Sequence, residues 1–251
     1  MSEVIEHPEY NRDTNPYPSF GKKYNGEKAI ISLTSWEKRI ATCPKTIFSL
    51  IQQCPGFHIV LVLSEEEFPK MCEELPENLM LFVENEMIEL LWVYKNYKSF
   101  KKVLFTMDKY RDVPVISADD DCIYTCNYAQ ELYDKWLTDK KSIFVYPHNK
   151  FNARRKTFSE TCGAYTIFPV NFHFNFLDKI DFIRLTNTTC LDDSFYGFAA
   201  SKLGIIIKNG YYNNFHSICV FHDSVNPLSA QESYKHKDKI LNAKLDKIWT
   251  I

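Results

Sequence analysis

Short apolar, strand-like runs alternate with helix-length segments through the first half of this chain. The strand-like runs are rich in Ile, Leu and Val, and they are 29–36, 58–64, 88–94 and 113–118. The helix-like segments between them are 39–54, 64–75 and 98–110. A strand, a crossover of helix length and a second strand form a βαβ unit, which makes the strands parallel and covers the sheet with helices. We therefore predict an α/β fold with a mainly parallel sheet flanked by helices.

The helix predicted for 64–75 has a start signal of its own. Ser64 stands at its first position, and Glu67 follows three residues later. A serine that accepts from the first-turn backbone, with a glutamate that reaches back to the serine N–H, forms a capping box. This pair therefore predicts that a helix begins at Ser64.

The two ends of the chain differ in pattern from its middle. Residues 1–27 are rich in Pro, Asn and Tyr and lack periodicity, so we expect an extended arm that leads into the core. Residues 226–251 form a lysine-rich tail with apolar residues at helical spacing. Such a tail can pack on the core as a helix or lie on a membrane surface. Packing on the core is the simpler expectation.

Composition predicts a soluble protein of the cytoplasm. The 251 residues are 45% hydrophobic and 15% aromatic, which is enough for a large core. The 30 basic and 32 acidic residues give a formal net charge of −2 and no general reason to expect a nucleic-acid partner. The eight cysteines lack paired CxxC spacing, so we expect them to be reduced thiols. The chain has no leader pattern and no apolar run of about 18 residues, although a peripheral contact with the inner membrane face stays open.

Three consecutive aspartates, Asp119, Asp120 and Asp121, follow the last of these strand-like runs. Ligands of parallel α/β sheets bind beyond the carboxyl ends of the strands, so these carboxylates would face a cleft. Asp119 and Asp121 form a D-x-D arrangement that can share one Mg²⁺ or Mn²⁺ ion, because both ions prefer oxygen ligands. Such an ion would neutralise a diphosphate leaving group. A solvated acidic turn is the alternative, but the repulsion between three adjacent charges favours the metal site.

Four motifs in order resemble those of bacterial and viral glycosyltransferases of the GT-A fold that build surface polysaccharides. They are "ISLTSWEKRI" (31–40), "IVLVLSEEEFP" (59–69), "KSFKK" (98–102) and "SADDDCIY" (117–124). The resemblance spans 28–225 and implies a single Rossmann-like domain, with a nucleotide-sugar-binding half (28–125) and an irregular acceptor half (126–225). It implies transfer of a sugar from a nucleotide-sugar, by family habit a UDP-sugar, to an acceptor hydroxyl, with Mn²⁺ or Mg²⁺ between the D-x-D motif and the diphosphate.

The same resemblance implies donor contacts at the end of the first predicted strand. Thr34 and Ser35 would hydrogen-bond the nucleotide, and Arg39 would lie near the base or the phosphates. Asp119 and Asp120 would join this donor site. From the residues alone, Thr34 and Ser35 are equally good strand-end caps, and Arg39 is equally good as a surface helix residue.

A group of lysines occupies the predicted start of the helix 98–110. Lys98, Lys101 and Lys102 stand at the N-terminal end of this helix, where the helix dipole disfavours positive charge. Helix stability therefore does not explain their placement. A phosphate or ribose of the donor would explain it, and the resemblance implies Lys102 first and Lys101 second. A solvated basic face is the alternative.

The second half of the chain contains an acidic pair and a glycine with possible roles at the acceptor. Asp192 and Asp193 precede residues at helical spacing, so either can be an N-cap or a first-turn acid. The resemblance implies that one of them, preferentially Asp193, removes the proton of the acceptor hydroxyl. Gly163 lies in "TCGAYTIFP" (161–169), where the resemblance implies a substrate pocket and a tight turn explains the glycine equally well.

One histidine is a candidate third metal ligand. His222 follows the short apolar run of "CVFHDS" (219–224), and a late histidine of GT-A proteins often binds the ion or touches the diphosphate. Neutral imidazole is an adequate ligand for Mn²⁺. Asp223 competes for this role, and a packed or surface histidine is the alternative.

Taken together, these residues predict a metal-dependent, hexosyltransferase-like enzyme that acts on a glycan or lipid-linked glycan in polysaccharide or glycoconjugate synthesis. The alternative is a nucleotide- or sugar-binding protein on the same fold without turnover. A phosphotransferase is disfavoured, because the chain has only seven glycines and shows no glycine-rich phosphate loop.

Overall fold

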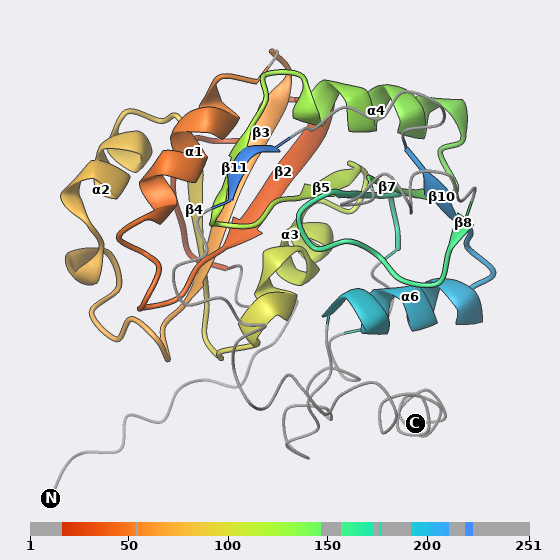
Figure 1. The fold of residues 1–251 in the computed structure, drawn as a ribbon. Helices are drawn as coiled ribbons and strands as arrows, with labels where there is room; N and C mark the ends of the chain where they lie inside the picture. Colours follow the sequence, from red (N-terminus) through yellow and green to blue (C-terminus); the bar gives the residue numbers. More distant parts are fainter. Residues whose placement is uncertain are drawn as a thin grey trace, which may run out of the picture.

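The computed structural model describes residues 17–53, 55–146, 157–172, 176, 192–210 and the backbone of the strand 219–222. In this part of the chain, nine strands form one mixed sheet, a further pair of strands stands apart from it, and helices flank the sheet (Figure 1). The predicted α/β class is confirmed.

The elements are short, and their bounds are as follows. The strands of the sheet are β1 (Ser19–Gly21), β2 (Ala29–Thr34), β3 (Phe57–Ser64), β4 (Glu89–Val93), β5 (Val115–Ser117), β7 (Ile143–Val145), β8 (Thr157–Phe158), β9 (Thr166–Phe168) and β10 (Ile207–Asn209). The separate antiparallel pair is β6 (Cys122–Tyr124) and β11 (Cys219–His222). The helices are α1 (Cys43–Ile51), α2 (Glu77–Glu84), α3 (Leu104–Lys109), α4 (Tyr128–Thr138) and α6 (Asp192–Lys202), with the 3₁₀ helices η1 (Met71–Glu74) and η2 (Lys98–Lys102).

The order of the strands creates a switch point in the sheet. The order is β1-β4-β3-β2-β5-β9-β7-β10-β8, and β4, β3, β2 and β5 run parallel. From β2 the chain goes to one side through β3 and β4, and it then returns to form β5 on the other side of β2. Ligands of such sheets bind at the carboxyl ends of the strands where the direction reverses. Here that place lies beyond Thr34 of β2 and Ser117 of β5.

The sheet becomes antiparallel beyond β5. Strand β9 runs antiparallel to both of its neighbours, β5 and β7. The parallel arrangement predicted from the first half of the sequence therefore holds for that half, and the less regular second half extends the sheet with β9, β7, β10 and β8.

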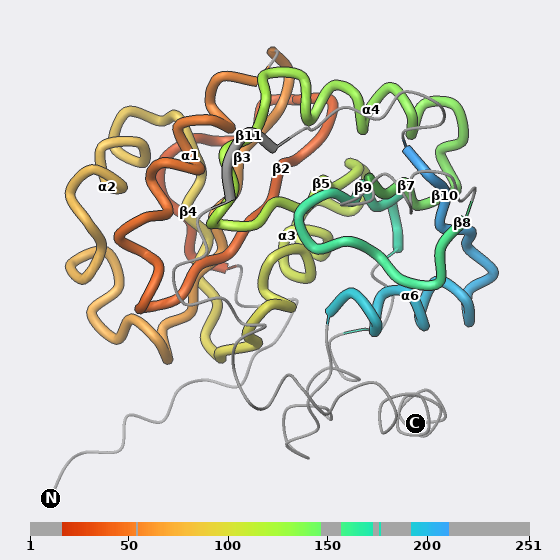
Figure 2. Tube along the Cα trace, in the orientation of Figure 1, coloured from red at the N-terminus to blue at the C-terminus, as the bar shows by residue number. Residues whose placement is uncertain are grey.

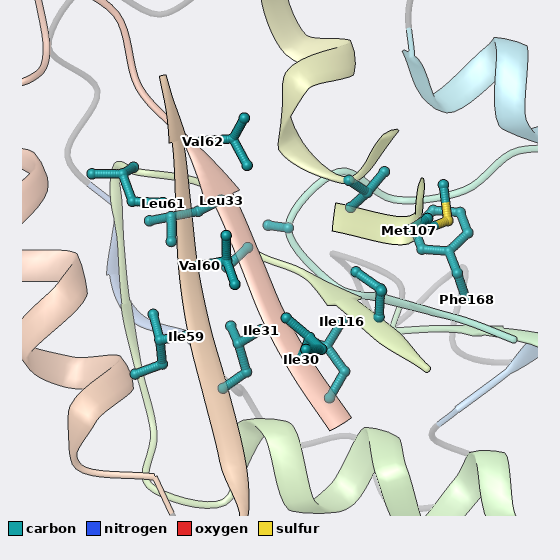
Figure 3. Close-up of a cluster of buried hydrophobic side chains, with 14 of the residues drawn as sticks. Ile30, Ile31, Leu33, Ile59, Val60, Leu61, Val62, Met107, Ile116 and Phe168 are labelled. Carbon is teal, nitrogen blue, oxygen red and sulfur yellow. The ribbon is translucent and has the colours of Figure 1, made fainter. Parts of the chain in front are cut away.

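The central strands are buried and mostly apolar because helices and loops cover both of their faces. Every residue of β3 is buried. Figure 3 shows Ile59 and Leu61 on one side of this strand and Val60 and Val62 on the other. A strand that is buried on both faces carries a continuous apolar run instead of an alternating one, which explains why these strands were predictable.

The structure corrects the helix predicted for 64–75. Ser64 is the last residue of β3, and a turn and η1 follow it. Ser64 and Glu67 do interact, but through their side chains, with Ser64 Oγ 2.8 Å from Glu67 Oε2. Pro69 explains the missing helix, because proline lacks the N–H that a helix interior needs and disfavours helical geometry in the residue before it.

The helix predicted for 98–110 is broken into η2 and α3. Val103, with φ of −129°, separates them. The hydroxyl of Ser32, in the middle of β2, donates to the carbonyl of Lys102 and lies 2.6 Å from the Thr106 hydroxyl. This bond to the sheet fixes the break and sets the position of Lys102.

Part of the predicted N-terminal arm is a strand of the sheet. β1 pairs antiparallel with β4, so residues 19–21 form the sheet edge. Gly21 has φ of +83°, and a Cβ at this position would overlap the carbonyl oxygen of Ile88. Only glycine fits such a close approach at a positive φ. Residues 1–16 of the arm lie outside the described residues.

A buried polar cluster joins β1, β3, β4 and α3 at the opposite edge from the carboxyl ends. Glu89, which is 2% exposed, accepts hydrogen bonds from Lys109 and Tyr110, and its Oε2 lies 2.7 Å from Nε2 of His58. Burial alone would raise the pKa of Glu89, but the bonds from these three groups lower it from 4.5 to about 2.

This cluster predicts a loss of stability in acid. A carboxylate whose pKa is lower in the folded state stabilises the fold above its unfolded pKa, and the stabilisation is lost as pH falls from about 4.5 to about 2. We expect Glu89→Gln to lower the free energy of unfolding by about 3 kcal/mol at pH 7 and to weaken its pH dependence in this window. Urea unfolding between pH 3 and 7 measures both. An unchanged pH dependence in the variant would contradict this role.

Candidate functional site

The three predicted aspartates lie at the switch point of the sheet. Asp119, Asp120 and Asp121 fill the turn between β5 and β6. The backbone N–H of Asp119 donates to the hydroxyl of Tyr124 over 2.8 Å, which closes the turn. Nothing in the spacing of Tyr124 along the sequence distinguishes it from a core tyrosine, so this contact was not predictable from the sequence.

The middle aspartate points into the protein. Asp120 is 1% exposed; it accepts a hydrogen bond from Ser35 and forms an ion pair with Arg39. Burial raises the pKa of Asp120 to about 6, although Arg39 and Ser35 act to lower it. Asp120 therefore links the end of β2 to the end of β5 and is not available as a metal ligand.

Arg39 bridges two of the three aspartates. Its Nη1 lies 2.6 Å from Asp121 Oδ2, while its other terminal nitrogen pairs with Asp120. The guanidinium thereby offsets the repulsion between adjacent carboxylates. In the structure the guanidinium of Arg39 is occupied by these two ion pairs. Its contact with the donor base or phosphates stays a prediction.

The two polar residues at the end of β2 also have partners within the protein. The hydroxyl of Thr34 donates to the carbonyl of Val62 in β3 over 2.7 Å, and Ser35 binds Asp120. These bonds match the strand-end capping alternative for both residues. Their donor contacts stay predictions.

Lys102 lies at the centre of a group of carboxylates. Its side chain is only 9% exposed; it forms an ion pair with Asp119, and its Nζ lies 3.6 Å from Asp192 Oδ2. Burial lowers the pKa of Lys102, but the charges of Asp119, Asp192 and Asp193 outweigh it and raise the pKa well above its ordinary value. Lys102 is thus a fixed positive charge, and the solvated basic face considered from the sequence is wrong for this residue.

Its neighbour Lys101 points to a different place. Lys101 is 1% exposed and pairs with Glu67, with Ser64 Oγ 3.3 Å and Asn96 Oδ1 3.1 Å from its Nζ. Consecutive residues of η2 diverge in this way because a 3₁₀ helix turns by about 120° per residue. The structure therefore separates the two predicted lysines, with Lys102 near the aspartates and Lys101 beyond β3.

The acidic pair at the start of α6 reaches the same place as Lys102. Asp192 is buried, while Asp193 is partly buried and accepts a hydrogen bond from the Thr161 hydroxyl over 2.9 Å. Burial and then the charge of Asp192 raise the pKa of Asp193 to about 7, against the opposing effects of Lys102 and Thr161. A carboxylate that titrates near neutral pH is suited to proton transfer.

Gly163 lies where these groups converge. A Cβ at this position would lie 2.9 Å from Lys102 Nζ, 3.4 Å from Asp193 Oδ2 and 3.5 Å from Asp119 Oδ1. No left-handed φ requires glycine here. Gly163 also lies in a tight turn, closed by the Tyr165 N–H, which donates to the Cys162 carbonyl over 2.9 Å. The absence of a side chain permits the close approach of the charged groups beside this turn.

The site has ligands for a divalent cation, but few of them. Within the residues that the structure describes, no group of three or more His, Cys, Asp or Glu side chains is arranged to hold a metal. Asp119 and Asp121 offer carboxylate oxygens, and Mg²⁺ is often bound by one or two carboxylates together with substrate phosphates. The residues present therefore fit the chemistry of Mg²⁺ or Mn²⁺ in the presence of a phosphate ligand.

The third predicted ligand is only partly located. His222 ends β11, and its backbone pairs with Cys122, the residue after Asp121. The strand pairing thus brings His222 next to the aspartate turn. The side chain of His222, Asp223 and the tail 226–251 lie outside what the structure describes.

None of the helices in the described ranges is long and apolar enough to cross a membrane.

Comparisons with known proteins give distant structural likenesses alone. No protein-family model matches the sequence, and no curated protein matches it. One similar solved structure is TarS 1-349 from S. aureus, at 8% identity and a TM-score of 0.48, covering 72% of this chain and 57% of that one. Another is the mannosyltransferase PcManGT from Pyrobaculum calidifontis in complex with GDP-Man and Mn²⁺, at 12% identity and a TM-score of 0.49, covering 79% and 59%. The chain thus matches less than two thirds of either structure.

The ion pairs of Arg39 predict a large stability effect at the aspartate turn. We expect Arg39→Ala to lower the free energy of unfolding by about 3–5 kcal/mol at pH 8, because it leaves the buried carboxylate of Asp120 without its cation. Lys45→Ala, at an exposed position of α1, is the matched control and should change it by less than about 0.5 kcal/mol. Urea unfolding measures both. Equal effects of the two variants would contradict the structural role of Arg39.

Proposed function

We propose that this chain is a metal-dependent glycosyltransferase. It would move a sugar from a nucleotide-sugar, with a UDP-sugar as the first donor to test, to a hydroxyl of a glycan or lipid-linked glycan. Two arguments support this: the sequence resemblance to GT-A enzymes, and the chemistry of the side chains at the switch point of the sheet. The distant structural likenesses are too weak to add to them.

One observation carries the proposal. Three groups from distant parts of the sequence, Asp119, Lys102 and Asp193, lie within 3.5 Å of one point, the position of a Cβ on Gly163. They come from the turn after β5, from η2 and from α6. A Cβ at that position would be too close to Lys102 Nζ, so glycine lets the three charged groups come together at the switch point of the sheet, where ligands of such sheets bind.

The chemistry of these residues matches the needs of sugar transfer. The oxygen of the acceptor hydroxyl forms a bond to the anomeric carbon of the donor, the bond from that carbon to the diphosphate breaks, and the diphosphate leaves with the electron pair. Asp193 would take the hydroxyl proton, since its pKa is raised to about 7. Lys102 would attract the diphosphate, because it stays positively charged while buried. A divalent cation held by Asp119 and Asp121 would add Lewis-acid stabilisation of the leaving group.

The contacts of the acidic pair favour Asp193 over Asp192 as the base. Asp192 is buried, and its Oδ2 lies 3.6 Å from Lys102 Nζ. Asp193 Oδ2 lies 3.4 Å from the position of a Cβ on Gly163. Asp192 therefore acts on the charge of Lys102, and Asp193 acts on the substrate.

A binding protein without turnover is the second candidate. Its specific support is that Asp119 and Asp121 already pair with Lys102 and Arg39. A cation bound to these aspartates would compete with both pairs. Donor binding and turnover therefore require separate experiments.

Donor binding predicts a metal-dependent thermal shift. With Mn²⁺ present and UDP at about 100 times its Kd, we expect the wild type to gain about 2.7 kcal/mol of stability, or about 5–10 °C in Tm. Asp121→Ala should lose this shift, and Asp112→Ala, in the exposed turn before β5, should keep it. A panel with the other nucleoside diphosphates identifies the base. If no nucleotide shifts the wild type with Mn²⁺ present, the donor site is wrong.

Turnover depends on Asp193. We expect Asp193→Asn to lower kcat by about 10²–10⁴-fold, the usual contribution of a general base, with the Kd for the donor changed less than about twofold. The wild-type kcat/KM should rise with pH through about 7, because the base must lose its proton. This rise should be absent in Asp193→Asn, and Asp112→Asn is the matched control. Full activity of Asp193→Asn would assign the proton transfer elsewhere.

A further inference from the structure

We propose that Thr161 is a positioning residue that fixes one carboxylate oxygen of Asp193 and directs the other toward Gly163, where Lys102 and Asp119 also converge. This inference rests on the proposed function, and its geometric support is the set of contacts that Thr161 and Gly163 make with Asp193.

The first support is the set of bonds that Thr161 makes to a single residue. Its hydroxyl lies 2.9 Å from Asp193 Oδ1 and 3.3 Å from the Asp193 carbonyl oxygen, and its backbone N–H lies 3.4 Å from the same carbonyl. The shortest of these contacts is to the side chain. A hydrogen bond to a charged group is stronger than one between neutral groups, so this bond favours one orientation of the carboxylate.

The second support is the different surroundings of the two carboxylate oxygens. Oδ1 of Asp193 is held by Thr161, while Oδ2 lies 3.4 Å from the Cβ position of Gly163. Lys102 Nζ and Asp119 Oδ1 border the same point. A free carboxylate could rotate and pair both of its oxygens with Lys102. The bond to Thr161 opposes that rotation, so Oδ2 stays directed toward Gly163, the side on which the proposed function requires the acceptor hydroxyl.

The third support is the packing that holds Thr161 against α6. A Cβ on Gly197, in the second turn of α6, would overlap the carbonyl oxygen of Ser159 and lie 2.7 Å from Cα of Glu160. Ser194 Oγ lies 3.1 Å from Glu160 Oε1. In Figure 2 the trace that leads from β8 toward β9 passes over α6. Glycine inside a helix is destabilising relative to alanine, and this close backbone contact accounts for its presence here.

The charged groups around Asp193 come from several elements. Lys102 lies on η2, Asp119 follows β5, and Asp192 is the residue before Asp193 in α6. Each of them acts through its charge at some distance. Among the contacts of Asp193 in the described residues, Thr161 supplies a directional bond that a substitution can remove without changing a charge.

Thr161→Val removes the hydroxyl and keeps the shape of the side chain, and Thr161→Ser keeps the hydroxyl. With the full-length protein, Mn²⁺ and a UDP-sugar as donor, we expect Thr161→Val to lower kcat by about 10–100-fold, with the Kd for the donor changed less than about twofold. Thr161→Ser should stay within about threefold of the wild type. Thr157→Val, at an exposed position of β8, is the matched control. If Thr161→Ser loses as much kcat as Thr161→Val, the positioning role is overturned.

A second measurement does not depend on activity. The carboxyl ¹³C signal of Asp193, assigned by its loss in Asp193→Asn, is titrated in the free protein. Because the bond from Thr161 lowers the pKa of this carboxyl, its midpoint should rise in Thr161→Val and return in Thr161→Ser. An unchanged midpoint in Thr161→Val overturns the proposal even in an active enzyme. A raised midpoint in a chain that transfers no sugar supports the positioning and contradicts the proposed function instead.

Discussion

The buried positive charge of Lys102 is the interaction on which the candidate site depends. Without it, Asp119, Asp192 and Asp193 would bring like charges together at one edge of the sheet, and burial would force some of them to take up protons. Lys102 is itself held by the bond between Ser32 and its carbonyl. The sheet therefore sets the position of the cation, and the cation allows the carboxylates to meet.

Arg39 has the corresponding role on the other side of the aspartate turn. It pairs with the buried Asp120 and with Asp121, so each end of the turn is compensated by a different cation. These pairs join the end of β2 to the end of β5, the two strands at which the sheet changes direction. The same residues therefore stabilise the fold and position the site.

The order of the strands explains why residues far apart in sequence meet here. η2 precedes β5, the aspartates follow it, and α6 lies about 70 residues further on, yet all three reach the carboxyl edge near β2 and β5. Strand β9 pairs with β5 and carries the segment with Gly163 and Thr161 to the same edge. An antiparallel extension of the sheet therefore completes a site that the parallel half begins.

Much of the first half was predictable from sequence, because strands buried on both faces leave long apolar runs. The predictions failed where a tertiary contact or a proline overrides local pattern. Pro69 ends the pattern that Ser64 and Glu67 begin, and the bond from Ser32 breaks the helix at Val103. Residues 19–21 were predicted as part of an extended arm, because an edge strand of three residues is too short to show a hydrophobic periodicity.

The sequence alone determined which residues carry charge at the strand ends: three aspartates after one strand, two lysines before it and an acidic pair far downstream. Only the tertiary structure decided which of them meet. Asp120 points inward to Arg39, Lys101 points away to Glu67, and Lys102 meets Asp119 and Asp192. The direction of a side chain depends on backbone geometry and on partners that are distant in the chain, and neither is encoded in the spacing of residues along one segment.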